Sequence, residues 1–308
     1  MSLLVVGSVG LDSVETPFGA RENVLGGSAT YFAAASSLLT ELSVVGVVGD
    51  DFPFAQLDFL AARKVSLEGL ERVPGRTFRW KGKYGFDLNV AQTLDTQLNV
   101  FEKFDPKLDA RAKAATRIFL GNIDPVLQLR VLEQVSRPRL VCADTMNFWI
   151  TSKRKELLEL LPRIDVLMVN DAEVRQLAGE ANVLKAARAA QKLGAKAVVV
   201  KRGEYGALLV HGTEDSFFAP AFPLSQVVDP TGAGDSFAGG FLGLIDRLDR
   251  EDAGALRQGV VMGSTIASFT VEEFSLDRLR TLDLRQIRAR FDAFKQLVHF
   301  EELPTWVS

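Results

Sequence analysis

Four consecutive residues, Gly232, Ala233, Gly234 and Asp235, have types and spacing that suit chemistry on a phosphate group. The glycines reach backbone angles that other residues avoid, so the N–H groups of this run can converge on one anion. An apolar helix is predicted to begin at about Asp235, and its N-terminus would add unpaired N–H groups and partial positive charge. A carboxylate there could accept the proton of a hydroxyl that attacks phosphorus. We therefore expect phosphoryl transfer, with Asp235 as catalytic base and residues 232–234 stabilising the transferred group.

The same run also has a purely structural interpretation, because Asp-Pro-Thr-Gly at 229–232 is a common turn and an acid before an apolar run often caps a helix. Gly239 and Gly240 favour the functional interpretation. In a purely structural helix, alanine at either site would be more stable than glycine by about 1 kcal/mol. We interpret these glycines as room for the close approach of another group.

Residues 229–235 read Asp-Pro-Thr-Gly-Ala-Gly-Asp, which resembles the signature Asp-x-Thr-Gly-Ala-Gly-Asp of the PfkB family of carbohydrate and nucleoside kinases. The resemblance implies an α/β fold of the ribokinase-like type, three layers (α/β/α) around a mainly parallel central sheet, with a small β lid. It implies one kinase domain over residues 1–308. It also implies ATP and Mg²⁺ as cofactors and a hydroxyl of a sugar, sugar derivative or nucleoside as acceptor.

The resemblance places the acceptor near the N-terminus. Asp12 lies beyond the first predicted strand, where open α/β sheets bind ligands, and the matching family residue holds substrate hydroxyls. From the residues alone, a surface turn is the less favoured alternative for Asp12. Gly26 and Gly27 resemble the Gly-Gly segment that lies against the sugar in the family. Tyr31 stands where ribokinase has an amide that binds the sugar, so the resemblance to ribokinase itself is weaker here.

Three further segments resemble the nucleotide side of the family site. Asn170 and Glu173 match its Asn-x-x-Glu motif, which implies phosphate and magnesium contacts, although the same spacing is a capping box. The strand ending at Lys201 leads into a turn that resembles the nucleotide-binding turn, and a solvated strand end is the alternative. Gly203 and Gly206 are the glycines of that turn. In a later apolar helix, Gly263 and Ser264 match the family positions that enclose the adenine, although a plain core helix explains these small residues equally well.

Composition indicates a cytoplasmic enzyme. The 36 basic and 39 acidic residues give a net charge of −3, so no general attraction to nucleic acid or to anionic membranes is expected. The single cysteine, Cys142, lies in an apolar run typical of a buried strand, and two histidines are too few to suggest a metal site. No apolar stretch approaches the length that spans a membrane, and no P-loop motif occurs.

Short apolar runs alternate with helical patterns, as in a parallel sheet covered on both faces. The predicted strands are Leu3 to Gly7, Leu42 to Val48, Ile118 to Leu120, Leu140 to Ala143, Val166 to Asn170 and Ala197 to Lys201. The predicted helices are Thr30 to Leu39, Phe54 to Arg63, Val126 to Gln134, Ser152 to Leu161, Ala172 to Ala178 and Val183 to Leu193, with a later apolar helix over Val260 to Phe269.

Residues 11–25 and 75–104 interrupt this alternation with strand-like patterns, and we expect them to form the lid. A lid can pair with a second subunit, so a homodimer through the lid is one possibility and a lid that only covers substrate is the other.

The residues leave the acceptor open among a free sugar or sugar acid, a sugar phosphate and a nucleoside. Lid aromatics Phe78, Trp80, Tyr84 and Phe86 could stack on a base with Tyr31, although aromatics at alternate strand positions usually pack. These lid aromatics and Tyr31 together predict an acceptor pocket that is wider and flatter than one made for ribose alone. A sugar-sensing protein that has lost its chemistry is the alternative of another class, and the intact 232–235 run argues against it.

Overall fold

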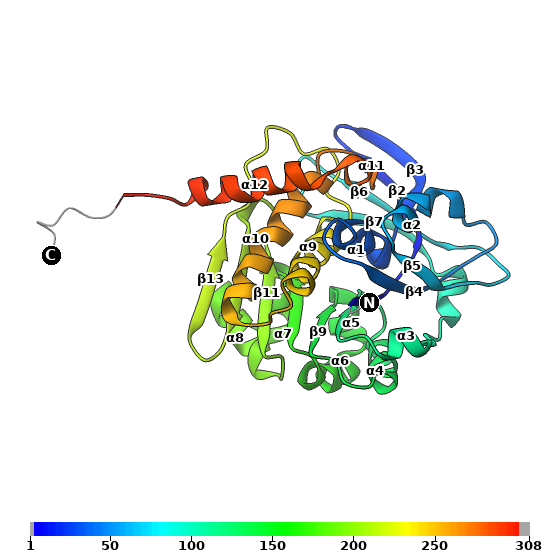
Figure 1. The fold of residues 1–308 in the computed structure, drawn as a ribbon, viewed down its shortest axis with the longest axis horizontal. Coiled ribbons are helices and arrows are strands. Elements are labelled where there is room, and N and C mark those ends of the chain that lie inside the picture. Colours follow the sequence, from blue (N-terminus) through cyan, green and yellow to red (C-terminus); the bar gives the residue numbers. More distant parts are fainter. Residues whose placement is uncertain (1–2, 302–308) are drawn as a thin grey trace, which may run out of the picture.

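A mostly parallel sheet of nine strands forms the centre of the computed structural model, which describes residues 3–301 (Figure 1). Its first seven strands in sequence pair in parallel, and the last two continue the sheet in antiparallel fashion. In spatial order the strands are β13 (Asp215–Ala219), β12 (Ala207–His211), β11 (Ala197–Lys201), β10 (Val166–Asn170), β9 (Leu140–Asp144), β8 (Arg117–Leu120), β1 (Leu3–Val6), β4 (Leu42–Val48) and β5 (Ser66–Arg72). The chain runs outward from β1 in both directions, so the strand order reverses there, and ligands of such sheets bind at the carboxyl ends beside this point.

Helices cover both faces of the sheet (Figure 1), and each face packs against its helices through a separate apolar core. One core involves α1 (Ser28–Ser36), α2 (Asp58–Ala62), α9 (Ala233–Leu248), α10 (Ala253–Thr270), α11 (Asp277–Thr281) and α12 (Leu284–Leu297). The other involves α3 (Ala110–Lys113), α4 (Pro125–Gln134), α5 (Asn147–Ser152), α6 (Arg154–Leu160), α7 (Asp171–Ala178) and α8 (Val183–Lys192). The predicted three-layer α/β/α architecture is therefore confirmed.

Strands from the two segments that interrupt the alternation form a second, four-stranded sheet. Its order is β3 (Gly19–Gly26), β2 (Gly10–Thr16), β6 (Phe78–Tyr84) and β7 (Ala91–Gln97). The β2 and β6 strands pair in parallel, so residues more than sixty positions apart lie side by side beyond the carboxyl end of β1. This small sheet positions Asp12 on β2 and Tyr84 on β6.

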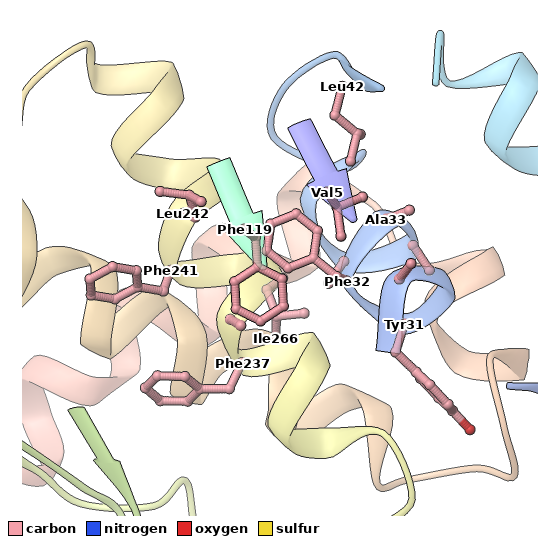
Figure 2. Close-up of a cluster of buried hydrophobic side chains, with 14 of the residues drawn as sticks. Val5, Tyr31, Phe32, Ala33, Leu42, Phe119, Phe237, Phe241, Leu242 and Ile266 are labelled. Atoms are coloured by element: carbon pink, nitrogen blue, oxygen red, sulfur yellow. The ribbon is translucent and has the colours of Figure 1, made fainter. Parts of the chain in front are cut away.

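Close helix packing explains the glycines of α9, where the sequence suggested the approach of another group. A methyl group on Gly239 would lie 2.5 Å from the carbonyl oxygen of Phe32 in α1, and one on Gly240 would lie 2.9 Å from that of Met262 in α10. Figure 2 shows α9 side chains beside Phe32 and Phe119, whose rings stack with centroids 4.4 Å apart. The close approach is therefore made by neighbouring helices.

Sequence patterns missed three strands of the large sheet and the ends of several helices. The β5 strand is half polar at the sheet edge, and β12 and β13 form an antiparallel hairpin that only a short 3-10 turn separates from β11. Two predicted helices are each split: Phe54 to Arg63 contains a 3-10 turn before α2, and the Ser152 to Leu161 stretch spans the junction of α5 and α6. Cys142 is buried in β9 as expected.

Candidate active site

The turn that we predict to bind an anion, residues 229–234 and called here the anion-binding turn, lies at the N-terminus of α9, which begins at Ala233 with Gly232 as its N-cap. Gly232 has φ of 72°, and the helix start has no side-chain cap. The Ala233 N–H donates to the Pro230 carbonyl oxygen at 3.2 Å within the turn, and the N–H groups on either side of it are open to a ligand. The ring of Tyr31 packs against this turn, because a methyl group on Gly232 would lie 2.3 Å from it. Only glycine fits between the turn and that ring.

Asp229 fixes the shape of this turn, a role that sequence reasoning missed. The buried carboxylate accepts hydrogen bonds from the backbone N–H of Thr231 at 2.9 Å and of Ser275 at 3.0 Å. The second bond joins the turn to the loop between α10 and α11. The first acid of the Asp-x-Thr-Gly run was the available signal, since an aspartate commonly bonds the backbone two residues on.

Asp235 lies in the first turn of α9, next to the anion-binding turn. Burial raises the pKa of its carboxyl to about 7, the Asp144 carboxylate acts in the same direction, and the Lys201 ammonium opposes both. A carboxyl with a pKa near neutrality is a stronger base than an ordinary aspartate and still ionises at physiological pH. This environment suits a group that removes a proton from a hydroxyl.

Asp144 and Lys201 form a buried ion pair beside Asp235. Asp144 ends β9 and Lys201 ends β11, and Lys201 Nζ lies 2.6 Å from Asp144 Oδ2. Burial lowers the pKa of Lys201, but the nearby carboxylates outweigh it and raise that pKa above its usual value. Sequence reasoning missed Asp144 because a single acid at a strand end has no pattern. Its position beyond an apolar run, at the edge where such sheets bind ligands, was the only signal.

Asn170 and Glu173 make the capping box that was weighed as the structural alternative. Asn170 Oδ1 accepts from the Glu173 N–H at 2.8 Å, and Glu173 Oε2 accepts from the Asn170 N–H at 2.7 Å. The Glu173 side chain is nevertheless buried toward the site: burial and then Asp144 raise its pKa to about 7, while Lys201 lowers it. The box uses one carboxylate oxygen, which leaves the other for a further contact.

Asp12 is buried and lies near other carboxylates and two phenol groups. Burial raises the pKa of Asp12 to about 7, followed by the effects of Asp229 and Asp235. Its carboxylate lies against Gly26, where a methyl group would come within 2.0 Å of Oδ2, and the Gly27 N–H donates to it. The double glycine thus lets the chain wrap closely around this carboxylate.

Two buried tyrosines accompany Asp12. Burial, and then Asp12 and Asp229, raise the pKa of Tyr31 well above its usual value. Burial, with smaller effects of Asp229 and Asp12, raises the pKa of Tyr84 to about 12, while its hydrogen bond with Thr231 acts in the opposite direction. The hydroxyls of Tyr84 and Thr231 lie 3.4 Å apart, so the small sheet touches the anion-binding turn. Figure 2 shows the Tyr31 hydroxyl pointing away from the apolar cluster.

The other aromatics of the small sheet do not form one stacking face with these tyrosines. The Trp80 indole lies over Gly82 and donates to Thr93 Oγ1 at 3.2 Å. The Phe78 ring packs against the Phe101 ring, with the ring centroids 5.6 Å apart. Phe86 is 98% exposed. The predicted wide, flat pocket therefore has no support from these three side chains.

Gly203 and Gly206 have φ of 54° and 85° in the turn after β11, where glycine is strongly favoured. Asn89, between β6 and β7, reaches this turn: its Nδ2 donates to Glu204 Oε1 at 2.9 Å. Gly263 and Ser264 lie within α10, and a methyl group on Gly263 would come within 2.8 Å of the Phe237 carbonyl oxygen. Helix packing thus accounts for Gly263.

Residues 11–279 match the pfkB family of carbohydrate kinases. The chain belongs to the PfkB family. Relatives in that family include a cytidine kinase of Thermococcus kodakarensis, 32% identical over 252 residues that span 79% of this chain and 87% of the relative. Like those kinases, this PfkB protein is a phosphotransferase with a hydroxyl group as acceptor.

Solved structures with the PfkB fold superpose on nearly the whole chain. The nucleoside kinase of Burkholderia thailandensis, determined with inosine, has a TM-score of 0.73 at 21% identity and covers 94% of this chain and 98% of its own. A ribokinase II from E. coli, determined with ATP and Mg²⁺, has a TM-score of 0.76 at 19% identity and covers 95% and 99%. These likenesses confirm the ribokinase-like fold. Within residues 3–301, no helix is both long and apolar enough to cross a membrane.

Proposed function

We propose that this PfkB enzyme is a single kinase domain that transfers the γ-phosphoryl group of ATP to a hydroxyl of a nucleoside. Asp235 accepts the proton of the attacking hydroxyl, and the N–H groups of residues 232–234 stabilise negative charge on the transferred group. The observation that carries the proposal is the position of Asp235, half-buried with a pKa raised to about 7, next to a helix N-terminus without a side-chain cap. The small sheet, which carries Asp12, acts as a lid over the site and excludes water from it.

The charge around Asp12 favours an uncharged acceptor. The charges that act most on Asp12 are the carboxylates of Asp229 and Asp235, which would repel the phosphate of a sugar phosphate or the carboxylate of a sugar acid. Among uncharged acceptors, the similarity to a cytidine kinase supports a nucleoside. A free sugar is the second candidate, because an Arabidopsis ribokinase is 39% identical to this chain over 88 residues.

A phosphorylation panel tests the acceptor. With ATP and Mg²⁺, we expect turnover with cytidine or another ribonucleoside, weak turnover with ribose, and none above background with a sugar acid or a sugar phosphate. Coupled detection of ADP and chromatography of the product measure this. If ribose is the best acceptor, the nucleoside assignment is wrong; if no acceptor is phosphorylated, the proposed reaction is wrong.

Magnesium fits the carboxylates on the nucleotide side, since it prefers oxygen ligands and keeps much of its water. No cluster of three or more candidate ligands occurs in the described part of the chain. Magnesium would neutralise phosphate charge. Glu173 would hold one of its waters, and Asn170, Lys201 and the 203–206 turn would face the nucleotide, whose adenine would lie near Gly263 and Ser264.

Replacing Glu173 with glutamine tests the metal assignment. Glutamine preserves the capping box, so the start of α7 should stay intact. We expect the Mg²⁺ concentration for half-maximal activity at saturating ATP to rise by about 10-fold or more, with the acceptor KM unchanged. An unchanged Mg²⁺ midpoint together with a raised acceptor KM would place Glu173 on the acceptor side instead.

We also propose that the small sheet pairs with a second copy of the chain. The edge strand β7 is exposed along its whole length, and Leu94 is 46% exposed on it. Exposed edge strands form intermolecular sheets readily. Sedimentation velocity of the parent and of a Leu94→Lys variant would show a dimer that the charge weakens.

A further inference from the structure

The Lys201 ammonium lies directly against the anion-binding turn. A methyl group on Gly234 would come within 3.1 Å of Lys201 Nζ, although the two residues belong to different layers of the fold. The lysine side chain is only 15% exposed, and lysines are almost never buried without a partner. A buried cation beside backbone N–H groups makes a strong site for an anion.

Asp144 holds this ammonium in place. Asp144 Oδ2 accepts from Lys201 Nζ at 2.6 Å, while Asp144 Oδ1 accepts from the Thr145 N–H at 2.8 Å. Its backbone carbonyl accepts from the side-chain amide of Gln128 at 2.9 Å. With both carboxylate oxygens engaged and the backbone tied to α4, Asp144 has little freedom to turn away from the lysine.

The ammonium has more donors than this pair uses. Lysine carries three N–H donors, and within residues 3–301 the Lys201 Nζ has one hydrogen-bond acceptor, Asp144. A purely structural pair in this buried place would leave two protons of a charged group without strong acceptors. Oxygen atoms of a phosphoryl group at residues 232–234 would supply them.

We propose that Lys201 is a catalytic residue that contacts the phosphoryl group during transfer, and that Asp144 is the positioning residue that aims it. The inference rests on the proposed kinase reaction and deepens it. The charge of Lys201 would stabilise the transition state more than the bound nucleotide, because negative charge shifts among the phosphoryl oxygens as the bond breaks.

The same pair also tunes the proton affinity of the base. Burial raises the pKa of Asp235 most, Asp144 raises it further and Lys201 lowers it. The other acids near Asp235 are Glu173 and Asp12, whose own pKa values it raises. Removing the charge of Asp144 should therefore shift the acid limb of kcat/KM to lower pH, and removing that of Lys201 should shift it to higher pH.

A double-mutant cycle tests the proposal. We expect Lys201→Met to lower kcat by about 100-fold or more and Asp144→Asn by about 10-fold, with nearly normal acceptor KM. Lys201→Arg, which keeps the charge, should recover part of the loss. Because Asp144 acts through Lys201, Asp144→Asn should cost nothing further in the Lys201→Met background. Equal thermal stability of the variants would exclude unfolding as the cause.

Two measurements without turnover complete the test. By calorimetry, Lys201→Met should weaken a non-hydrolysable ATP analogue by about 10-fold or more and ADP far less, since only the analogue carries a γ-phosphoryl group. Carboxyl carbon NMR of the free protein should show the two opposite pKa shifts of Asp235. The inference would be overturned if Lys201→Met weakened binding of the analogue and of ADP equally, or if the kcat losses of Lys201→Met and Asp144→Asn added independently in the double variant. If Asp235→Asn keeps its activity, the proposed reaction fails instead.

Discussion

Replacing Asp235 with asparagine is expected to lower kcat by at least about 100-fold while nucleotide affinity changes little. The amide has nearly the same volume as the carboxylate, so the first turn of α9 and the N–H groups of residues 232–234 should keep their geometry. It cannot accept the proton of the attacking hydroxyl. Steady-state kinetics at saturating substrates, with calorimetry of ADP binding, measure the two quantities. Activity within a few-fold of the parent would show that another group is the base.

The same substitution should stabilise the fold at alkaline pH. The pKa of Asp235 is raised to about 7 from an ordinary 3.8, so the folded state holds its proton more tightly than the unfolded state. Stability is therefore lost as pH rises from about 4 to 7, and asparagine escapes this loss. We expect a gain of about 1 to 3 kcal/mol above pH 7, fading toward pH 4.

Thermal melts of Asp235→Asn at pH 5 and pH 8 measure this gain, with Asp58→Asn as the control at an exposed carboxylate of α2. The control should have equal effects at both pH values. A Tm for Asp235→Asn below that of the parent at pH 8 would mean that the ionised carboxylate stabilises the fold, contrary to its burial. Loss of activity with a gain in stability is the signature of a strained catalytic group.

Local sequence was sufficient to predict the glycine turn and the helix start that carries Asp235, while their roles stay predictions. The glycines and the acid are adjacent in the chain, so their chemistry depends on one turn and one helix start. The alternation of apolar runs with helical patterns likewise placed six strands of the large sheet. The same reasoning misread Gly239 and Gly240, because what approaches them is Phe32 of α1 and Met262 of α10. Nothing in a single helix shows which neighbours it will have.

Groups that act through tertiary contacts were out of reach. Asp144 is one acid at the end of β9, and only the neighbouring strand order brings it to Lys201 and Asp235. Tyr84 was noted only as one of several lid aromatics. Its hydroxyl lies 3.4 Å from that of Thr231, whereas Trp80, four residues earlier in the same strand, lies over Gly82. A pattern of aromatics in one strand cannot tell which of them reaches the site.

Asp12 should decide which acceptor hydroxyls are accepted. Its buried carboxylate lies against Gly26 and receives the Gly27 N–H, so its remaining hydrogen-bonding capacity faces the site. If it binds the vicinal hydroxyls of a ribonucleoside, an acceptor that lacks one of them leaves a buried carboxylate unpaired. We expect the deoxy acceptor to lose about 2 to 4 kcal/mol in kcat/KM, a factor of roughly 30 to 1,000.

Asp12→Ala should lose a similar factor with the ribonucleoside and little more with its deoxy analogue, so the preference between the two acceptors should nearly vanish. Comparing the parent, Asp12→Ala and Asp12→Asn with cytidine and its 2′-deoxy and 3′-deoxy forms measures this, and the asparagine variant shows whether charge or hydrogen bonding matters. Burial of Asp12 at a raised pKa also predicts that both variants are at least as stable as the parent above pH 7. Full kcat/KM in Asp12→Ala, or an unchanged preference for the ribonucleoside, would place the acceptor hydroxyls on other residues.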